Sequence, residues 1–385
     1  MSTSTVFSSL TVRSPEGTVE LREAVVSDHL RLEELKFRHH MVAERDDAYL
    51  HLFERYHLYC GGMTHYPMGW VLETTQRQLV GHIGNIYLDY YLNTKRVITA
   101  SARAWVVDIM YRGSAFALLR TFCTQPNVDL LLITTANLRV GRVFAKQGAL
   151  KPPTVSYDRA AFWIIGHHRF ALGVLAKKNV SLASILAFPV GAFLSAVSWV
   201  RNIGRCRPNR HTYITEVTTI DERFDRYWEK LRAQPNRLIC VRDRAAMAWR
   251  FERPMRAGHA WIFAYYGTPN ELSGYAVFLR QDSPDIGLRR MRLVDFQSEG
   301  DGAKFLHDAI EVALARCRDE GIHMLESVGF GNVRRKQIDA LAPYQRQLPA
   351  WMFWYKASEK NPELAKALLN PDVWDPCTYD GDGCF

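Results

Sequence analysis

The hydrophobic and polar positions of residues 18–160 predict an alternation of strands and helices. Apolar or β-branched runs between polar turns are typical of strands, and we expect strands at 19–22, 70–73, 78–88, 97–108 and 128–135. Apolar residues spaced by about 3.6 positions are typical of amphipathic helices, and we expect helices at 29–35, 115–123 and 138–147. This order predicts a mixed α/β domain.

The same order of elements recurs in residues 212–357. Here the pattern predicts strands at 212–218, 261–266, 274–280, 291–296 and 323–328, and helices at 221–233, 303–320 and 332–341. We therefore expect two α/β domains in tandem. The sequence divides into a flexible N-terminus over 1–17, domains at 18–160 and 212–357, a helical connector over 161–211 and a tail over 358–385.

The connector contains a stretch, 180–200, without any charged residue, and Lys177, Lys178 and Arg201 flank it. Its length would suffice to span a bilayer. However, we expect Pro189 and Gly191 to break a single helix there. Three interpretations stay open: a buried interdomain helix pair, an element on a membrane surface, and a membrane span.

Charge and cysteine content limit the partners of the chain. Its 385 residues carry 49 Lys and Arg against 40 Asp and Glu, a formal net charge of +9, which favours anionic partners. No RNA-recognition or zinc-finger pattern accompanies this charge, so we expect no nucleic acid partner. The seven cysteines lack the spacing of a disulfide framework or a zinc site. We therefore expect a cytoplasmic protein without a metal, at the inner face of the membrane if 180–200 touches lipid.

Two segments place small residues where a predicted strand runs into a helix. Backbone N–H groups at such a helix start can hold a phosphate if the side chains are small. The first segment contains Arg112, Gly113, Ser114 and Ala115, and the second contains Gln297, Ser298, Glu299, Gly300, Asp301 and Gly302. A third pattern begins with Asn137 at a strand end and continues with Phe144, Lys146 and Gly148.

With these motifs the chain resembles the GNAT acyltransferase superfamily. The pyrophosphate loop of that family reads Gln or Arg, two residues, Gly, one residue, then Gly or Ala, and 297–302 matches every specified position. In the N-terminal half Ala115 replaces the first Gly, and its Cβ would hinder a phosphate. Asn137 matches the spacing of a second family signature, and Asn332 begins its eroded C-terminal counterpart. The resemblance implies two tandem GNAT-like domains that bind acyl-coenzyme A through these two loops, Asn137 and Asn332.

The resemblance also implies direct attack of an amine or hydroxyl on the thioester carbonyl, which a backbone N–H polarises. Candidates for the proton transfers are Asp295, Glu326 and Tyr355, with Asp108 as an N-terminal counterpart of the two acids. Each residue could instead be structural.

The expected function is N- or O-acyl transfer from acyl-coenzyme A to a small-molecule or glycan acceptor, and the overall pattern is similar to GNAT-like proteins of surface polysaccharide biosynthesis. Two alternatives stay open. One is an enzyme of the N-acyl amino acid synthase type that takes its acyl group from acyl carrier protein. The other is a non-catalytic scaffold or regulator that retains the fold.

Overall fold

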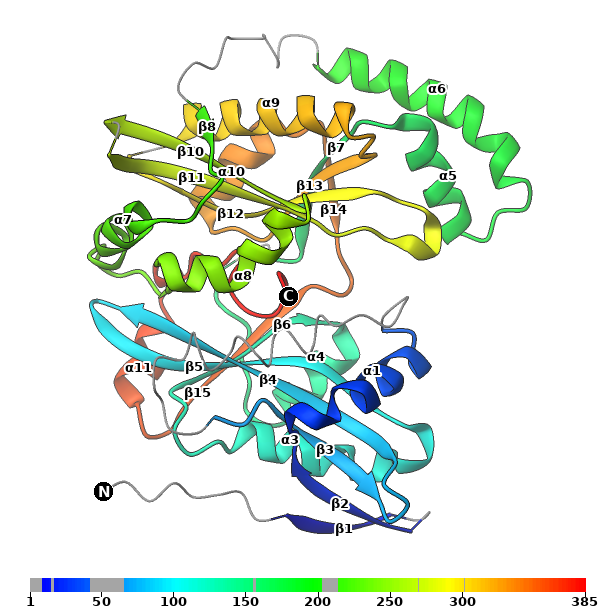
Figure 1. The fold of residues 1–385 in the computed structure, drawn as a ribbon, viewed down its shortest axis with the longest axis vertical. Coiled ribbons are helices and arrows are strands. Elements are labelled where there is room, and N and C mark those ends of the chain that lie inside the picture. Colours follow the sequence, from blue (N-terminus) through cyan, green and yellow to red (C-terminus); the bar gives the residue numbers. More distant parts are fainter. Residues whose placement is uncertain are drawn as a thin grey trace.

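The structure is a computed structural model that describes residues 9–14, 17–41, 66–154, 157–202, 214–268, 270–300 and 302–385. Its described residues form two mixed β-sheets, one above the other in Figure 1. This confirms the expected α/β class with two sheets.

The first sheet has the strand order β1-β2-β3-β4-β5-β6-β15, and the short β9 pairs with β4. Its strands are β1 (Leu10–Ser14), β2 (Gly17–Glu23), β3 (Gly69–Thr74), β4 (Leu79–Leu92), β5 (Lys95–Val107), β6 (Leu130–Ala136), β9 (Ile239–Cys240) and β15 (Met352–Ala357). The helical elements in this half are η1 (Val26–Asp28), α1 (His29–Arg38), η2 (Ile109–Ser114), α3 (Ala115–Cys123), α4 (Leu138–Ala145) and α11 (Pro362–Ala367).

The second sheet has the strand order β14-β7-β13-β12-β11-β10-β8. Its strands are β7 (Arg159–Ile164), β8 (Ile214–Glu216), β10 (Ala260–Thr268), β11 (Glu271–Arg280), β12 (Arg290–Ser298), β13 (Met324–Val328) and β14 (Tyr344–Gln347). Its helical elements are α5 (His167–Lys177), α6 (Ala183–Asn202), α7 (Glu222–Arg232), α8 (Arg244–Arg256), η3 (Pro284–Ile286), α9 (Ala303–Asp319), α10 (Asn332–Leu341) and η4 (Pro371–Val373).

Two longer strands cross between the halves, in addition to the short β9, which pairs with β4. β7 follows the elements of the first sheet but pairs with β13 of the second, and β15 follows the second sheet but pairs with β6 of the first. The sequence-based division placed 352–357 in the second domain, and here the structure differs. Both strands are apolar, and apolar alternation shows that a strand is buried without showing which strand it pairs with. One hydrophobic core consequently contains residues of both sheets.

The C-terminal tail lies between the two sheets (Figure 1). Cys377 and Tyr379 are fully buried there, together with most of 376–384. This end of the chain is rich in Gly and Asp, yet the fold encloses most of it. Its polar groups find buried partners instead of water, as the contacts described below show.

The connector forms the helices α5 and α6. Contrary to expectation, α6 continues through Pro189 and Gly191 as one helix. Pro189 has no N–H group, so a backbone carbonyl near Ile185 lacks its helical hydrogen-bond donor. The Ile185 side chain is exposed, so solvent can bind that carbonyl instead. Among the described residues, no helix has the length and apolarity to cross a membrane.

Candidate functional site

The C-terminal loop lies where β12 and β13 separate. These strands pair in parallel only over Arg290–Leu293 and Met324–Ser327, and the last residues of β12 then lead into the loop before α9. Gly300 and Gly302 have φ angles of +66° and +62°, a left-handed conformation that favours glycine. A Cβ at Gly302 would also overlap the Ser298 side chain. Asp301 lies outside the described residues.

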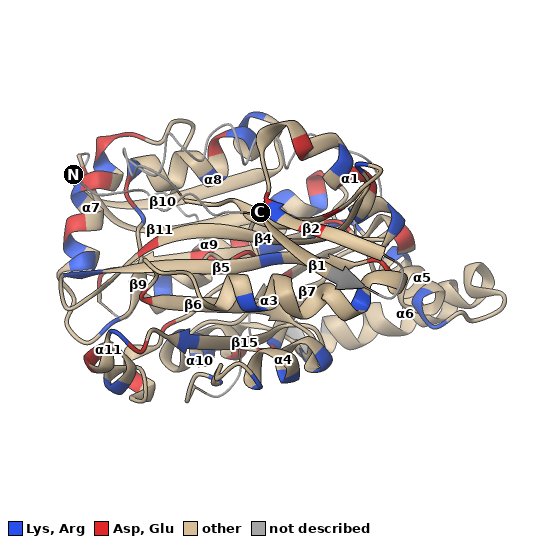
Figure 2. Cartoon of the chain, turned by 90° about the horizontal axis from the view of Figure 1, so that it is seen from below, with Lys and Arg blue, Asp and Glu red and all other residues tan. Residues whose placement is uncertain are grey.

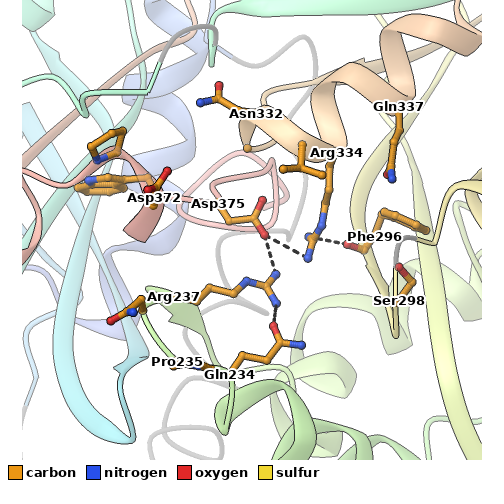
Figure 3. Close-up of a pocket in the computed structure, with 16 residues that line it drawn as sticks. Gln234, Pro235, Arg237, Phe296, Ser298, Asn332, Arg334, Gln337, Asp372 and Asp375 are labelled. Carbon is orange, nitrogen blue, oxygen red and sulfur yellow. Dashed lines mark hydrogen bonds and ion pairs between the residues drawn. The ribbon is translucent and has the colours of Figure 1, made fainter.

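A cavity of about 370 Å³ lies beside this loop (Figure 3). Three predicted residues, Ser298, Gly300 and Asn332, line it. Its wall also includes Arg237, Arg334, Phe296, Gln337, Asp372, Trp374 and Asp375. The N-terminus of α10 and the loop before α9 therefore face one space.

Two arginines and two aspartates are the charged residues of the cavity wall, and one aspartate pairs with both arginines. Asp375 Oδ2 lies 2.8 Å from Arg237 Nη2 and 3.1 Å from Arg334 Nη2 (Figure 3). Burial, and secondly the nearby Arg334, lower the pKa of Arg237 to about 10. Because the two arginines already share Asp375, an anion in the cavity would have to compete with this carboxylate for them.

Both polar atoms of the Gln297 side-chain amide have partners within the protein. Its Oε1 accepts hydrogen bonds from Arg237 at 2.8 Å and from Arg334 at 3.0 Å. Its Nε2 donates to Asp295 Oδ1 at 2.9 Å. Gln297 thus fixes the two arginines and connects them to Asp295.

Asp295 is fully buried. Its Oδ2 accepts hydrogen bonds from Arg242 Nε and from Tyr275 Oη, both at 2.9 Å. Burial alone would raise the pKa of Asp295, but the charge and hydrogen bonds of Arg242 outweigh burial and lower it. Asp295 is therefore an enclosed, ionised side chain with several partners.

Glu326 is also fully buried, away from the residues that line the cavity. Its carboxylate pairs with Arg292, with Arg290 at 3.3 Å and with Arg346 at 2.7 Å. Burial raises the pKa of Glu326, but the charges of these arginines, Arg292 first, lower it to about 2. The structure thus keeps the two acids that sequence analysis proposed as bases, Asp295 and Glu326, in separate ion-pair clusters.

The tail fills the divergence of β12 and β13. Tyr379 N donates to Val294 O at 2.9 Å on the β12 side. On the other side Cys377 forms an isolated bridge with Gly329, and Thr378 Oγ1 donates to Val328 O at 3.2 Å. The backbone of 377–379 therefore occupies the space between the two strand ends.

In the N-terminal half β5 and β6 separate in the same way. They pair in parallel only over Thr99–Ser101 and Leu130–Leu132. A register shift against β4 follows, and Ala104 there has a φ of +49°. Such a bulge lifts one residue out of the ladder. Residues 103–105 are partly exposed, whereas Val294 in β12 is fully buried.

One tail residue reaches this N-terminal divergence. Asp382 accepts hydrogen bonds from Thr134 Oγ1 at 2.5 Å and from Thr135 Oγ1 at 2.8 Å, both on β6. Burial raises the pKa of Asp382, although the two threonines and the charge of Arg103 on β5 oppose this. A carboxylate thus lies between the separated ends of β5 and β6.

The predicted N-terminal loop forms η2 and the start of α3. Arg112 and Gly113 are exposed, and Ala115 is the first residue of α3. Ser114 is buried, and its Oγ has no hydrogen-bond partner among the described residues. Asn137 is the N-cap of α4, where its side chain accepts from Val140 N at 3.0 Å.

The other predicted residues of this half have structural partners. Tyr355 lies in β15 of the first sheet, and its hydroxyl donates to Leu368 O at 3.4 Å. Burial raises the pKa of Tyr355. Asp108 Oδ1 lies 2.6 Å from His39 Nε2, so it has a partner directly after α1.

Sequence analysis missed Arg237, Arg334, Asp375 and Asp382. Arg334 follows Asn332 by two residues, which was a usable signal for the cavity wall. The acidic tail residues gave no signal, because only the folded chain brings Asp375 to the arginines and Asp382 to β6.

Comparison with known proteins identifies the fold. No family model and no curated protein matches the sequence. Among solved structures, a probable N-acyltransferase of Enterococcus faecalis V583 is 13% identical with a TM-score of 0.53, over 88% of this chain and 72% of that one. N-myristoyltransferase of Saccharomyces cerevisiae with bound myristoyl-CoA is 10% identical with a TM-score of 0.53, over 91% of this chain and 85% of that one.

The chain has the tandem GNAT fold. In its two GNAT-like halves, the separated strands are β5 and β6 in the first and β12 and β13 in the second. At these identities the likeness concerns the fold alone.

Proposed function

We propose that the protein is an acyltransferase that moves an acyl group from acyl-coenzyme A to an amine or hydroxyl, with the reaction in the N-terminal GNAT-like half. One contrast carries this proposal. The tail backbone of 377–379 fills the separation of β12 and β13, whereas the bulge at 103–105 is partly exposed. A thioester arm would therefore meet only the Asp382 side chain of the tail at the first strand pair, but would have to displace buried backbone at the second.

The residues around the N-terminal bulge supply the groups that the reaction needs. A backbone N–H at the bulge would polarise the thioester carbonyl, and the start of α3 beside Gly113 would hold the donor diphosphate. Asp382 would take the proton from the acceptor as its nitrogen or oxygen bonds to the carbonyl carbon. The carbon–sulfur bond then breaks, and coenzyme A leaves as a thiolate that solvent protonates.

The C-terminal cavity favours a second binding mode. Its arginines and the left-handed Gly300 suit the diphosphate of coenzyme A, or the phosphopantetheine of an acyl carrier protein. In that mode the donor would lie beside α10 and would have to displace Asp375 from Arg237 and Arg334. Acyl transfer in the C-terminal half would also require residues 377–379 to move out of the space between β12 and β13.

Thiol release from acetyl-coenzyme A and from a long-chain acyl-coenzyme A tests the proposal directly. The assay uses the full chain with a panel of amino acids, amino sugars and sugar alcohols as acceptors. We expect acceptor-dependent release that Asp382→Asn reduces by roughly a hundredfold or more, the usual scale for loss of a general base. Asn can keep one hydrogen bond to Thr134 or Thr135, so the fold should persist.

The matched control is Asp285→Asn, because Asp285 is exposed in η3 and remote from both strand separations. It should leave the rate unchanged. No acceptor-dependent release from any donor would argue against the enzyme. Unchanged activity in Asp382→Asn would exclude Asp382 as the base.

A further inference from the structure

The helix α6 packs on α5 with its smallest residues. Ala187 is fully buried and Ser198 is 5% exposed. A Cβ at Gly191 would come within 2.8 Å of His168 Cα, so glycine permits the close approach of the two helices. Ser198 Oγ also lies 2.9 Å from His167 Nε2 and 2.8 Å from Tyr344 Oη. These contacts fix which side of α6 faces the protein.

The opposite side of α6 presents large apolar side chains to solvent. Four of them are exposed by 60% or more: Ile185 at 65%, Phe188 at 74%, Phe193 at 68% and Val200 at 60%. A surface helix of a globular protein normally shows the reverse arrangement, with its large apolar residues against the core. A contiguous exposed apolar face of this kind marks an interaction site.

The segment that carries this face has charges of a single sign. Residues 159–215 contain no Asp or Glu, and Arg169, Lys177 and Lys178 are exposed on α5 or directly after it. Figure 2 shows α5 and α6 as an arm that projects from the body and carries no acidic colour. The arm is therefore apolar along α6 and cationic at α5.

We propose that the outer face of α6 docks on the surface of an anionic phospholipid bilayer, with the apolar residues among the acyl chains and the cations of α5 among the headgroups. Apolar side chains together with lysine and arginine form the combination that holds a helix in a membrane interface. A second copy of the chain is disfavoured as the occupant, since a two-fold contact would bring cations of the same sign together. This surface is independent of the acyl-transfer site proposed above.

Cosedimentation with vesicles tests the docking surface. Vesicles of phosphatidylcholine alone are compared with vesicles of equal parts phosphatidylcholine and phosphatidylglycerol, at low and high salt. We expect the full chain to bind the anionic vesicles more tightly and to lose affinity as salt rises. Phe188→Ser and Phe193→Ser should each weaken binding roughly tenfold or more, because each removes a buried aromatic ring from the interface.

Two further variants complete the design. The double substitution Lys177→Glu and Lys178→Glu should abolish the preference for anionic vesicles. Leu30→Ser is the matched control, since Leu30 is 65% exposed on α1, and it should bind as the wild type does. Circular dichroism verifies that each variant is folded.

Equal binding of the wild type to both vesicle types, or no binding to either, would overturn the proposal. Light scattering measures whether the protein is a monomer or a dimer, and a dimer could also contradict the proposal. If the wild type is a dimer that Phe193→Ser converts to a monomer, the face is an interface between copies of this chain.

Discussion

Asp382 is partly buried, which raises its pKa, and two threonine hydroxyls hold it at the point where β5 and β6 separate. A carboxylate with a raised pKa is a stronger base than an exposed one. The same burial means that protons compete for it at a higher pH.

This gives a prediction for the pH profile of thiol release. A base must be deprotonated, so the rate should fall as pH falls through the raised pKa of Asp382, above the range of an exposed carboxylate. The measurement is the turnover number against pH for the wild type and for Asp382→Asn. The residual rate of the variant should lack this acidic limb, and an identical limb in both proteins would assign it to another group.

The pKa of Glu326 is lowered rather than raised, and this predicts how the stability of the protein depends on pH. Its pKa is lowered from the ordinary 4.5 to about 2, so its ion pairs contribute stability above pH 4.5 that is lost as pH falls toward 2. Glu326→Gln should lower the free energy of unfolding at neutral pH by about 3 to 5 kcal/mol, because it leaves buried arginines without a charge partner. Urea unfolding at several pH values tests this, and a variant with unchanged pH dependence would contradict it.

At the scale of elements, the strands and helices of both halves follow the hydrophobic pattern of the sequence. The strands β3 to β6 and β10 to β13 overlap the expected segments, and most of them extend beyond these by a few residues. The helices α7, α9 and α10 lie within the expected segments. The hydrophobic pattern does not show which strands pair with each other. The sequence therefore did not predict that β7 and β15 pair with strands of the other half. Residues of the family signatures that we expected to bind the cofactor also have structural contacts, since Asn137 caps α4 and Gln297 accepts hydrogen bonds from two arginines.

Gly141 in α4 shows how close the packing of β15 against the first half is. A Cβ at this position would overlap the Trp354 indole, whereas a Cβ at Gly113 would meet no atom within 4 Å. We expect Gly141→Ala to destabilise the protein by about 1 to 3 kcal/mol through this overlap, despite the better helix propensity of alanine. Gly113→Ala is the matched control and should be neutral or slightly stabilising in thermal unfolding. Equal effects of the two substitutions would refute the described contact.

At the scale of the whole molecule, the two GNAT-like halves form one folding unit. Each sheet contains a strand from the other half, and the tail is bonded to Val294 in the second sheet and to Thr134 in the first. We expect the far-ultraviolet circular dichroism and the tryptophan fluorescence to report one coincident unfolding transition in urea. Two separated transitions would show that the halves unfold independently.

The two loops at the helix starts provide matched variants that distinguish the two possible donor sites. Gly113→Glu places a negative charge at the N-terminal loop, where a side chain meets open space. Asn332→Glu places the same charge at the C-terminal cavity, on the exposed first residue of α10, where an acid also favours the helix. Both variants should remain folded.

The most direct measurement is calorimetric titration of acyl-coenzyme A into the wild type and these two variants. We expect one donor site, with binding lost in Gly113→Glu and retained in Asn332→Glu. Loss of binding in Asn332→Glu alone would move the donor to the C-terminal cavity and contradict the assignment of the reaction to the N-terminal half.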